Sequence, residues 1–246
     1  MTDVSDSTEP VPPGGAATLP AEPASAGDSA VEQEAVVDLL AALAYGELSA
    51  FQRLAEDATL APTLSDKAAI AGMAVAEFQH FQRAAGRLEE LGVDPDVAMA
   101  PFVGPLNAFH SATMPTDWLT GLIKAYVGDG IAADFYREVA AYVDEPTRDL
   151  VLDVLRDTGH AAFAVERVRA AVAADPHLAG RLALWARRLV GEAMVQAQRV
   201  AVDREALTAL IVGGAAGAGG LVELGRMLAR LTEAHTKRMA QLGLRA

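Results

Sequence analysis

Apolar residues recur at helical spacing along most of the chain. The first such stripe runs through Val36, Leu40, Ala44, Phe51 and Leu54, which share one face of a helix over about residues 36–58. Comparable stripes separated by Gly and Pro predict five further helices, over about 65–91, 116–143, 146–174, 178–203 and 220–242. Strand-like alternation is rare, so the pattern predicts an all-α fold.

The order of these helices suggests a particular bundle. Residues 92–116 contain four prolines and form a long connection between the second and third helices, with room for a short helix inside it. Two helices, a long crossover and two more helices are the connectivity of a ferritin-like four-helix bundle. We therefore expect a helical domain over 33–246, with the bundle in 35–174 and two additional C-terminal helices in 178–242.

The N-terminal segment 1–32 differs in composition. It is rich in Pro, Ala, Gly, Ser and acidic residues and has no periodicity, so we expect a disordered tail. The net charge of the whole chain is −13, and without the seven acids of the first 34 residues 26 acidic residues face 20 basic ones. A mildly acidic body is an ordinary surface and gives no electrostatic footprint for binding a polyphosphate.

Two further features bound the function. There is no cysteine, so disulfides and thiolate metal sites are excluded, and a metal would need oxygen and imidazole ligands, which suit iron, manganese or zinc. The N-terminus lacks the basic region and apolar run of a secretory signal, and the glycine-rich segment 206–222 is more typical of a connection between helices than of a membrane span. A cytoplasmic protein with no membrane contact is expected, and a homodimer is left open.

Acidic and imidazole side chains interrupt the apolar stripes of the first four predicted helices. Burying an unpaired carboxylate costs several kcal/mol, so several such groups in one core need compensating cations. Two divalent ions would balance four carboxylates and two neutral imidazoles. The predicted metal ligands are Glu47 on the first helix, Glu77 and His80 on the second, Asp129 on the third, and Asp157 and His160 on the fourth.

The spacing of these residues repeats. Glu77 and His80, like Asp157 and His160, are three residues apart and so share a helix face. An upstream acid precedes each pair, by 30 residues in the first half and 28 in the second. The alternative is that the helices are mis-phased and these side chains lie on the surface or in salt bridges. On the third helix Asp134 competes with Asp129 for the buried position.

At these residues the sequence resembles the ferritin-like di-iron carboxylate proteins, and within them the tRNA isopentenyladenosine hydroxylase (MiaE-like) branch. The resembling stretches are 45–48 (YGEL), 76–81 (AEFQHF), 128–136 (GDGIAADFY) and 157–160 (DTGH). The resemblance implies two iron ions, one bound by Glu47, Glu77 and His80 and the other by Asp129, Asp157 and His160, with Glu77 and Asp157 as bridges. Manganese is the alternative metal.

The activity implied by the resemblance is oxygen-dependent hydroxylation of a prenyl group on a tRNA base, with dioxygen as co-substrate. Asp replaces the family's Glu at 129 and 157, and its shorter side chain would hold the second metal closer to the backbone or less tightly. A tRNA partner would need a local basic patch. The dense set of basic residues is Arg181, Arg187, Arg188, Arg199 and Arg204, for which a solvated helix face is the simpler interpretation.

Three functions from different classes remain open on the sequence. The first is a di-iron oxygenase or oxidase, an oxidoreductase of unknown substrate, for which small residues at 132, 133, 161 and 164 would leave room. The second is a ferritin-type iron-binding protein without substrate oxidation. The third is a metal-free helical interaction module. Tyr45, Tyr126 and Tyr136 are interpreted as core residues with satisfied hydroxyls, and His110 and His235 have no partner at ligand spacing.

Overall fold

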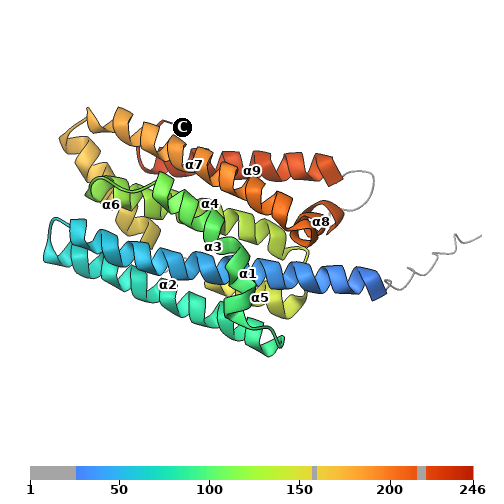
Figure 1. The fold of residues 1–246 in the computed structure, drawn as a ribbon. Helices are drawn as coiled ribbons and strands as arrows, with labels where there is room; N and C mark the ends of the chain where they lie inside the picture. Colours follow the sequence, from blue (N-terminus) through green and yellow to red (C-terminus); the bar gives the residue numbers. More distant parts are fainter. Residues whose placement is uncertain (1–25, 157–159, 215–219, 246) are drawn as a thin grey trace, which may run out of the picture.

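The computed structural model describes residues 26–156, 160–214 and 220–245, and in them the chain is entirely helical, which confirms the predicted all-α class (Figure 1). None of the helices in these ranges is long and apolar enough to cross a bilayer. The elements are α1 (Ala26–Asp57), a 3-10 turn (Ala58–Leu60), α2 (Leu64–Glu90), α3 (Pro95–Ala112), α4 (Trp118–Ala140), α5 (Glu145–Val154), α6 (His160–Ala174), α7 (Leu178–Asp203), α8 (Glu205–Gly214) and α9 (Gly220–Gln241).

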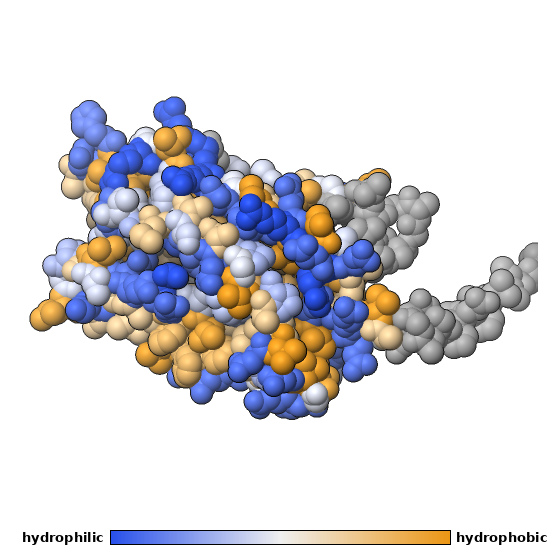
Figure 2. Space-filling model, in the orientation of Figure 1, coloured by the Kyte–Doolittle hydropathy of each residue, from blue (hydrophilic) through white to orange (hydrophobic). Residues whose placement is uncertain are grey.

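The bundle is built from α1, α2, α4 and the tandem pair α5–α6. Figure 1 shows α1 and α2 side by side along one layer, α7 and α9 along the opposite layer, and α4 and α6 between them. The crossover helix α3 contacts α1 and α7, while α9 contacts α4 and α8. Figure 2 shows exposed apolar residues along the side of the molecule on which α2 lies in Figure 1. Val75 and Phe78 of α2 are among the exposed large apolar residues.

The buried apolar residues of the bundle form two separate clusters. One contains Leu39 and Leu43 of α1 with Leu88 of α2, and the other contains Leu54 of α1 with Ile70 of α2. The antiparallel hairpin thus contributes one end of each helix to each cluster. Helix α4 also divides in this way, with 122–127 in the second cluster and 139–140 in the first. The interval between the clusters is a layer with few buried apolar residues.

The structure differs from the predicted helices at several places. Helix α1 begins at Ala26, ten residues before the predicted start, and its residues 30–34 are exposed. Those turns are helical through the propensity of Ala, Glu and Gln rather than through burial, so an apolar stripe could not reveal them. Residues 1–25 of the predicted tail lie outside the described residues.

The predicted connection over 92–116 is mostly the 18-residue helix α3, even though Pro101 and Pro105 lie inside it. Asp94 caps its N-terminus by accepting hydrogen bonds from the backbone N–H groups of Asp96 and Val97, and Pro95 occupies the first turn, where its missing N–H costs nothing. Buried Phe102 then anchors the helix against the bundle.

The C-terminal half shows two further differences. The fourth predicted helix is divided, because α5 ends where the N–H of Leu155 bonds to the carbonyls of Val151 and Asp153, and α6 begins at His160. Helices α7 and α9 match the two predicted C-terminal helices, and the additional helix α8 lies in the segment that we expected to be a connection. Arg204 at the start of α8 binds buried Asp38 of α1 and so holds this region against the bundle.

Candidate metal site

The polar layer between the two apolar clusters contains the predicted ligands. On α1 the first cluster includes Ala44 and the second resumes at Leu54, and Glu47 lies between them. On α2 the corresponding interval runs from Ala74 to Ala84 and contains Glu77 and His80. Residues 128–138 of α4 lie in the same interval between the clusters, and His160 at the start of α6 lies between Val154 of the first cluster and Ala164 of the second. The helices therefore place their ionisable residues at the same position along the bundle axis.

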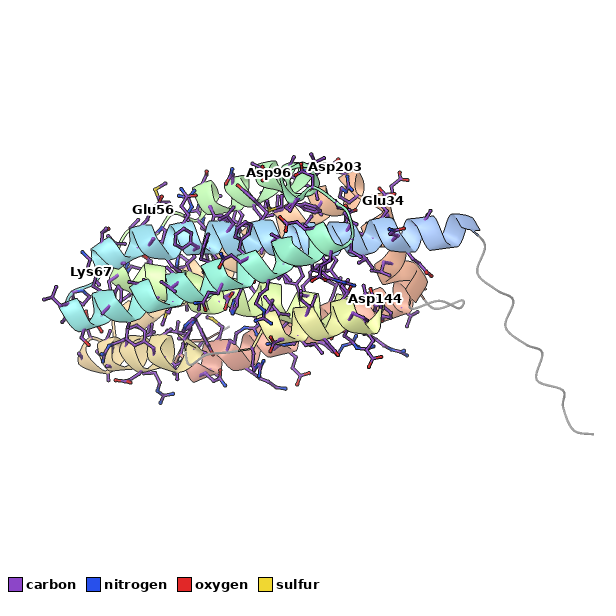
Figure 3. The ribbon with its side chains drawn as sticks, turned by 90° about the horizontal axis from the view of Figure 1, so that it is seen from below. Glu34, Glu56, Lys67, Asp96, Asp144 and Asp203 are labelled. Carbon is purple, nitrogen blue, oxygen red and sulfur yellow. The ribbon has the colours of Figure 1, made fainter. Side chains whose placement is uncertain are left out.

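The first hairpin assembles three of the predicted ligands. Nδ1 of His80 lies 3.4 Å from Oε2 of Glu47 and 3.4 Å from Oε2 of Glu77. One donor atom from each residue lies within 4.8 Å of the other two. Both carboxylates are buried, with Glu47 8% and Glu77 5% exposed. The acids labelled in Figure 3, such as Glu56 and Asp144, are exposed by contrast. This cluster has the composition and geometry of a metal-binding site.

The electrostatics of this cluster reflect its burial. Burial, followed by contact with Glu77, raises the pKa of Glu47 well above its usual value, and the charge of Asp129 acts in the same direction. Burial also acts to raise the pKa of Glu77, but contacts with Glu47 and His80 together bring it below its usual value. The two carboxylates outweigh burial at His80 and raise its pKa to about 10.

One atom of the cluster is unsatisfied. Oε2 of Glu47 is buried and receives no hydrogen bond, because the nearby Nδ1 of His80 does not meet the geometry of one. A buried carboxylate oxygen without a donor is costly and needs an explanation. A cation bound between Glu47, Glu77 and His80 would supply that oxygen with the missing partner. The residues present therefore fit a metal ion.

The second half of the predicted site is less enclosed. His160, the first residue of α6, is half-buried, and its charge lowers the pKa of Glu77, so it faces the first-half cluster. Asp129 is exposed rather than on the buried stripe of α4. At 3.6 residues per turn it lies about 60° around the helix axis from buried Tyr126. Asp157 lies outside the described residues, so its role as a ligand stays a prediction.

Asp134, the competitor of Asp129, has a protein partner instead. Nη1 of Arg238 in α9 lies 2.6 Å from Oδ2 of Asp134, and the arginine side chain is largely buried. The Arg238 side chain passes directly over Gly130, where an added Cβ would lie 2.7 Å from Cδ of Arg238. The glycine therefore allows α9 to place its cation against α4. Arg238 compensates the charge of Asp134 that a metal would otherwise compensate.

Some relevant residues escaped the sequence interpretation. Tyr136 was expected to be an ordinary core residue, but burial and the charge of Glu47 raise its pKa, which places its phenol close to the cluster. Gly46 lies beside that phenol, since an added Cβ would be in ordinary contact with the Tyr136 hydroxyl at 3.6 Å. In the sequence, the feature that could have pointed to these residues was the run Tyr45-Gly46-Glu47. Nothing in the sequence pointed to Arg238.

The comparison with known families agrees with this architecture. A family model described as ferritin-like domain, actinomycetes, matches residues 30–214, well over half of the chain. The match includes α1 to α8 apart from the first residues of α1, and it ends before α9. No curated protein matches the chain. The chain therefore belongs to the ferritin-like domain family of actinomycetes.

Proposed function

We propose that this protein binds iron in the polar layer of the bundle and uses dioxygen to oxidise or hydroxylate a substrate. The observation that carries the proposal is the enclosed cluster of Glu47, Glu77 and His80, in which a buried oxygen of Glu47 has no donor. Carboxylate and imidazole donors suit iron or manganese, and the absence of sulfur ligands fits the same metals.

The proposed second ion would be held by His160 with Asp129 and Asp157. His160 and Asp129 have the same kind of support, because the charge of His160 acts on Glu77 and that of Asp129 acts on Glu47. Bound ferrous ions would supply the electrons for reducing dioxygen. The protein's own part is to hold the ligands in a layer closed above and below by apolar clusters, and to keep the phenol of Tyr136 protonated beside Glu47.

The proposal is tested by measuring metal content. Protein purified without chelators is loaded anaerobically with ferrous iron, desalted and assayed for bound metal. We expect wild type and the control variant Glu89→Ala to retain iron, because Glu89 is an exposed residue of the same helix. Glu77→Ala should lose it while keeping its helical circular dichroism. Unchanged iron content in Glu77→Ala would show that the ligand assignment is wrong.

A second measurement separates an oxidase from an iron store. Dioxygen consumption by the iron-loaded protein, without growth of a ferric mineral on further addition of iron, is the result expected for an enzyme. Mineral growth in proportion to added iron would instead identify a ferritin-type protein.

One observation favours a metal-free interaction module as the second candidate. The cluster can balance its own charge, because the raised pKa values of Glu47 and His80 favour a protonated carboxyl and an imidazolium beside the ionised Glu77. Wild-type protein that binds neither iron nor manganese under the loading conditions above would establish this alternative.

The described contacts favour a small-molecule substrate over tRNA. Each arginine of the predicted basic patch already donates a hydrogen bond within the protein. The acceptors are Asp117 for Arg181, the Arg245 carbonyl for Arg187, the Ala112 carbonyl for Arg188, Gln196 for Arg199 and Asp38 for Arg204. Two of these cations, Arg181 and Arg204, are neutralised by carboxylates, which reduces the charge that the patch offers to a phosphate backbone.

A further inference from the structure

A hollow beside the second half of the predicted metal site could hold a small molecule. It is a surface depression of about 360 Å³ that is open to solvent, and Ala162, Arg169 and Gln241 in its walls are exposed. Tyr126 of α4, Ala161, Ala162, Val165 and Arg169 of α6, and Gln241 of α9 line it. Ala161 directly follows the predicted ligand His160, and Tyr126 lies one helical turn before Asp129. The hollow therefore adjoins the layer in which oxidation is proposed.

The walls of the hollow divide into an apolar part and a polar part. Ala161, Ala162 and Val165 present only methyl groups, and they leave space because they are small. On the polar side, the Tyr126 hydroxyl donates a hydrogen bond to Oε1 of Gln241, and Nη1 of Arg169 donates one to the Gln241 carbonyl oxygen at 3.2 Å. Gln241 thus fixes the phenol and the guanidinium in relation to each other.

Arg169 is the cation of this hollow, and its charge has no acidic partner. No carboxylate lies within 4.0 Å of it in the described chain, and its hydrogen bond goes to a neutral carbonyl. Its neighbour on the same helix, Arg167, is by contrast paired with buried Asp66 at 2.7 Å. An arginine with unused donors at the rim of an apolar hollow is suited to grip a planar or tetrahedral anion.

We propose that this hollow binds a small ligand with an apolar body and an anionic head group, carboxylate or phosphate, which Arg169 holds. The apolar body would lie along Ala161, Ala162 and Val165, and so toward His160. The inference that this ligand is the substrate rests on the proposed oxidase function. Binding of the ligand itself needs no metal.

The test uses three probes of equal chain length: octanoate, octyl phosphate and octanol. Isothermal titration calorimetry of the full chain should show one of the two anions binding at least about tenfold more tightly than octanol, which is the scale of a charge-assisted hydrogen bond. Which of the two anions binds better tells carboxylate from phosphate. Equal affinity for octanol and both anions, or no binding of any probe at millimolar concentration, would overturn the proposal.

Two variants locate the site. Arg169→Met should weaken binding of the preferred anion about tenfold or more. The matched control Arg187→Met removes an exposed arginine that also bonds to a carbonyl, and should leave the affinity unchanged. Ala162→Trp should block binding by filling the hollow without changing its charge. Unchanged affinity in both Arg169→Met and Ala162→Trp would show that the anion binds elsewhere.

Metal content is measured on the same preparations, so the two proposals fail separately. If anion binding depends on Arg169 in a protein that retains no iron, the proposed ligand site is supported and the proposed oxidase function is rejected. Retained iron with affinity insensitive to Arg169→Met and Ala162→Trp would support the metal site and remove the hollow.

Discussion

The two halves of this bundle carry nearly the same spacing of acids and histidines and yet differ in structure. In the first hairpin, α1 and α2 enclose Glu47, Glu77 and His80 so closely that their donor atoms lie within 4.8 Å of one another. In the second half Asp129 is exposed, and the fourth helix is divided into α5 and α6. Equal spacing along the sequence therefore places the acids and histidines of the two halves at the same position along the bundle axis, but it does not give them equal burial.

The helices that pack over each half explain much of the difference. The crossover helix α3 packs against α1 and contains no Lys or Arg, so in the described chain the buried acids of the first half are paired with His80, and the charge of His160 also acts on Glu77. Helix α9 packs against α4 and brings Arg238, which pairs with Asp134. The carboxylates of the first half are thus a site that a bound cation could compensate, whereas in the second half Arg238 already compensates Asp134.

The largest expected effect of this asymmetry is on metal binding. Glu47→Gln should remove all tightly bound iron, because it takes one of only three enclosed ligands of the first half. Asp129→Asn should retain the iron of the first half, since Asp129 lies at the exposed edge of the layer. Iron per chain after desalting measures both. Equal losses in the two variants would mean that the halves bind metal as one symmetric unit.

The sequence predicted the height of the site better than its surroundings. The period of the apolar stripes located Glu47 and Glu77 on buried faces, because those faces pack against other bundle helices. The same reasoning failed for Asp129, because the orientation of α4 also depends on α7 and α9, whose docking no local pattern encodes. Similarly, the role of Gly130 depends on a side chain 108 positions later in the sequence, which approaches only after α9 has packed.

A smaller effect is expected from the cation that α9 supplies. Arg238→Met keeps much of the apolar stem but leaves Asp134 with only the more exposed Arg137, 3.3 Å away, so we expect a loss of about 2 kcal/mol in the free energy of unfolding. The matched control is Arg230→Met, which removes the more exposed pair with Glu138 on the same two helices and should cost less than about 1 kcal/mol. Urea denaturation measures both, and equal losses would show that Arg238 has no special place in the second half.

The smallest expected effect concerns the cover of the first half and its response to acid. His110 of α3 contacts Ser49 of α1 through Nε2 at 3.2 Å. Burial lowers its pKa to about 3, helped by the nearby charges of Lys124 and Arg53. Asp57, whose own pKa is raised by burial, acts in turn on the pKa of Lys124. His110 thus stays neutral in the folded chain at a pH where the unfolded chain takes up a proton.

Because the folded pKa of His110 is below the unfolded value of about 6.5, its contribution to stability is complete above that pH and declines as the pH falls toward 3. Each pH unit in this window lowers the free energy of unfolding by about 1.4 kcal/mol at most. His110→Gln should therefore flatten the acid dependence between pH 5.5 and 4.5 by about 1 kcal/mol, whereas the exposed His177→Gln should not. Hydrogen exchange at pH 5 should then show α3 loosening before α9, and the opposite order would mean that the cover of the second half is the weaker one.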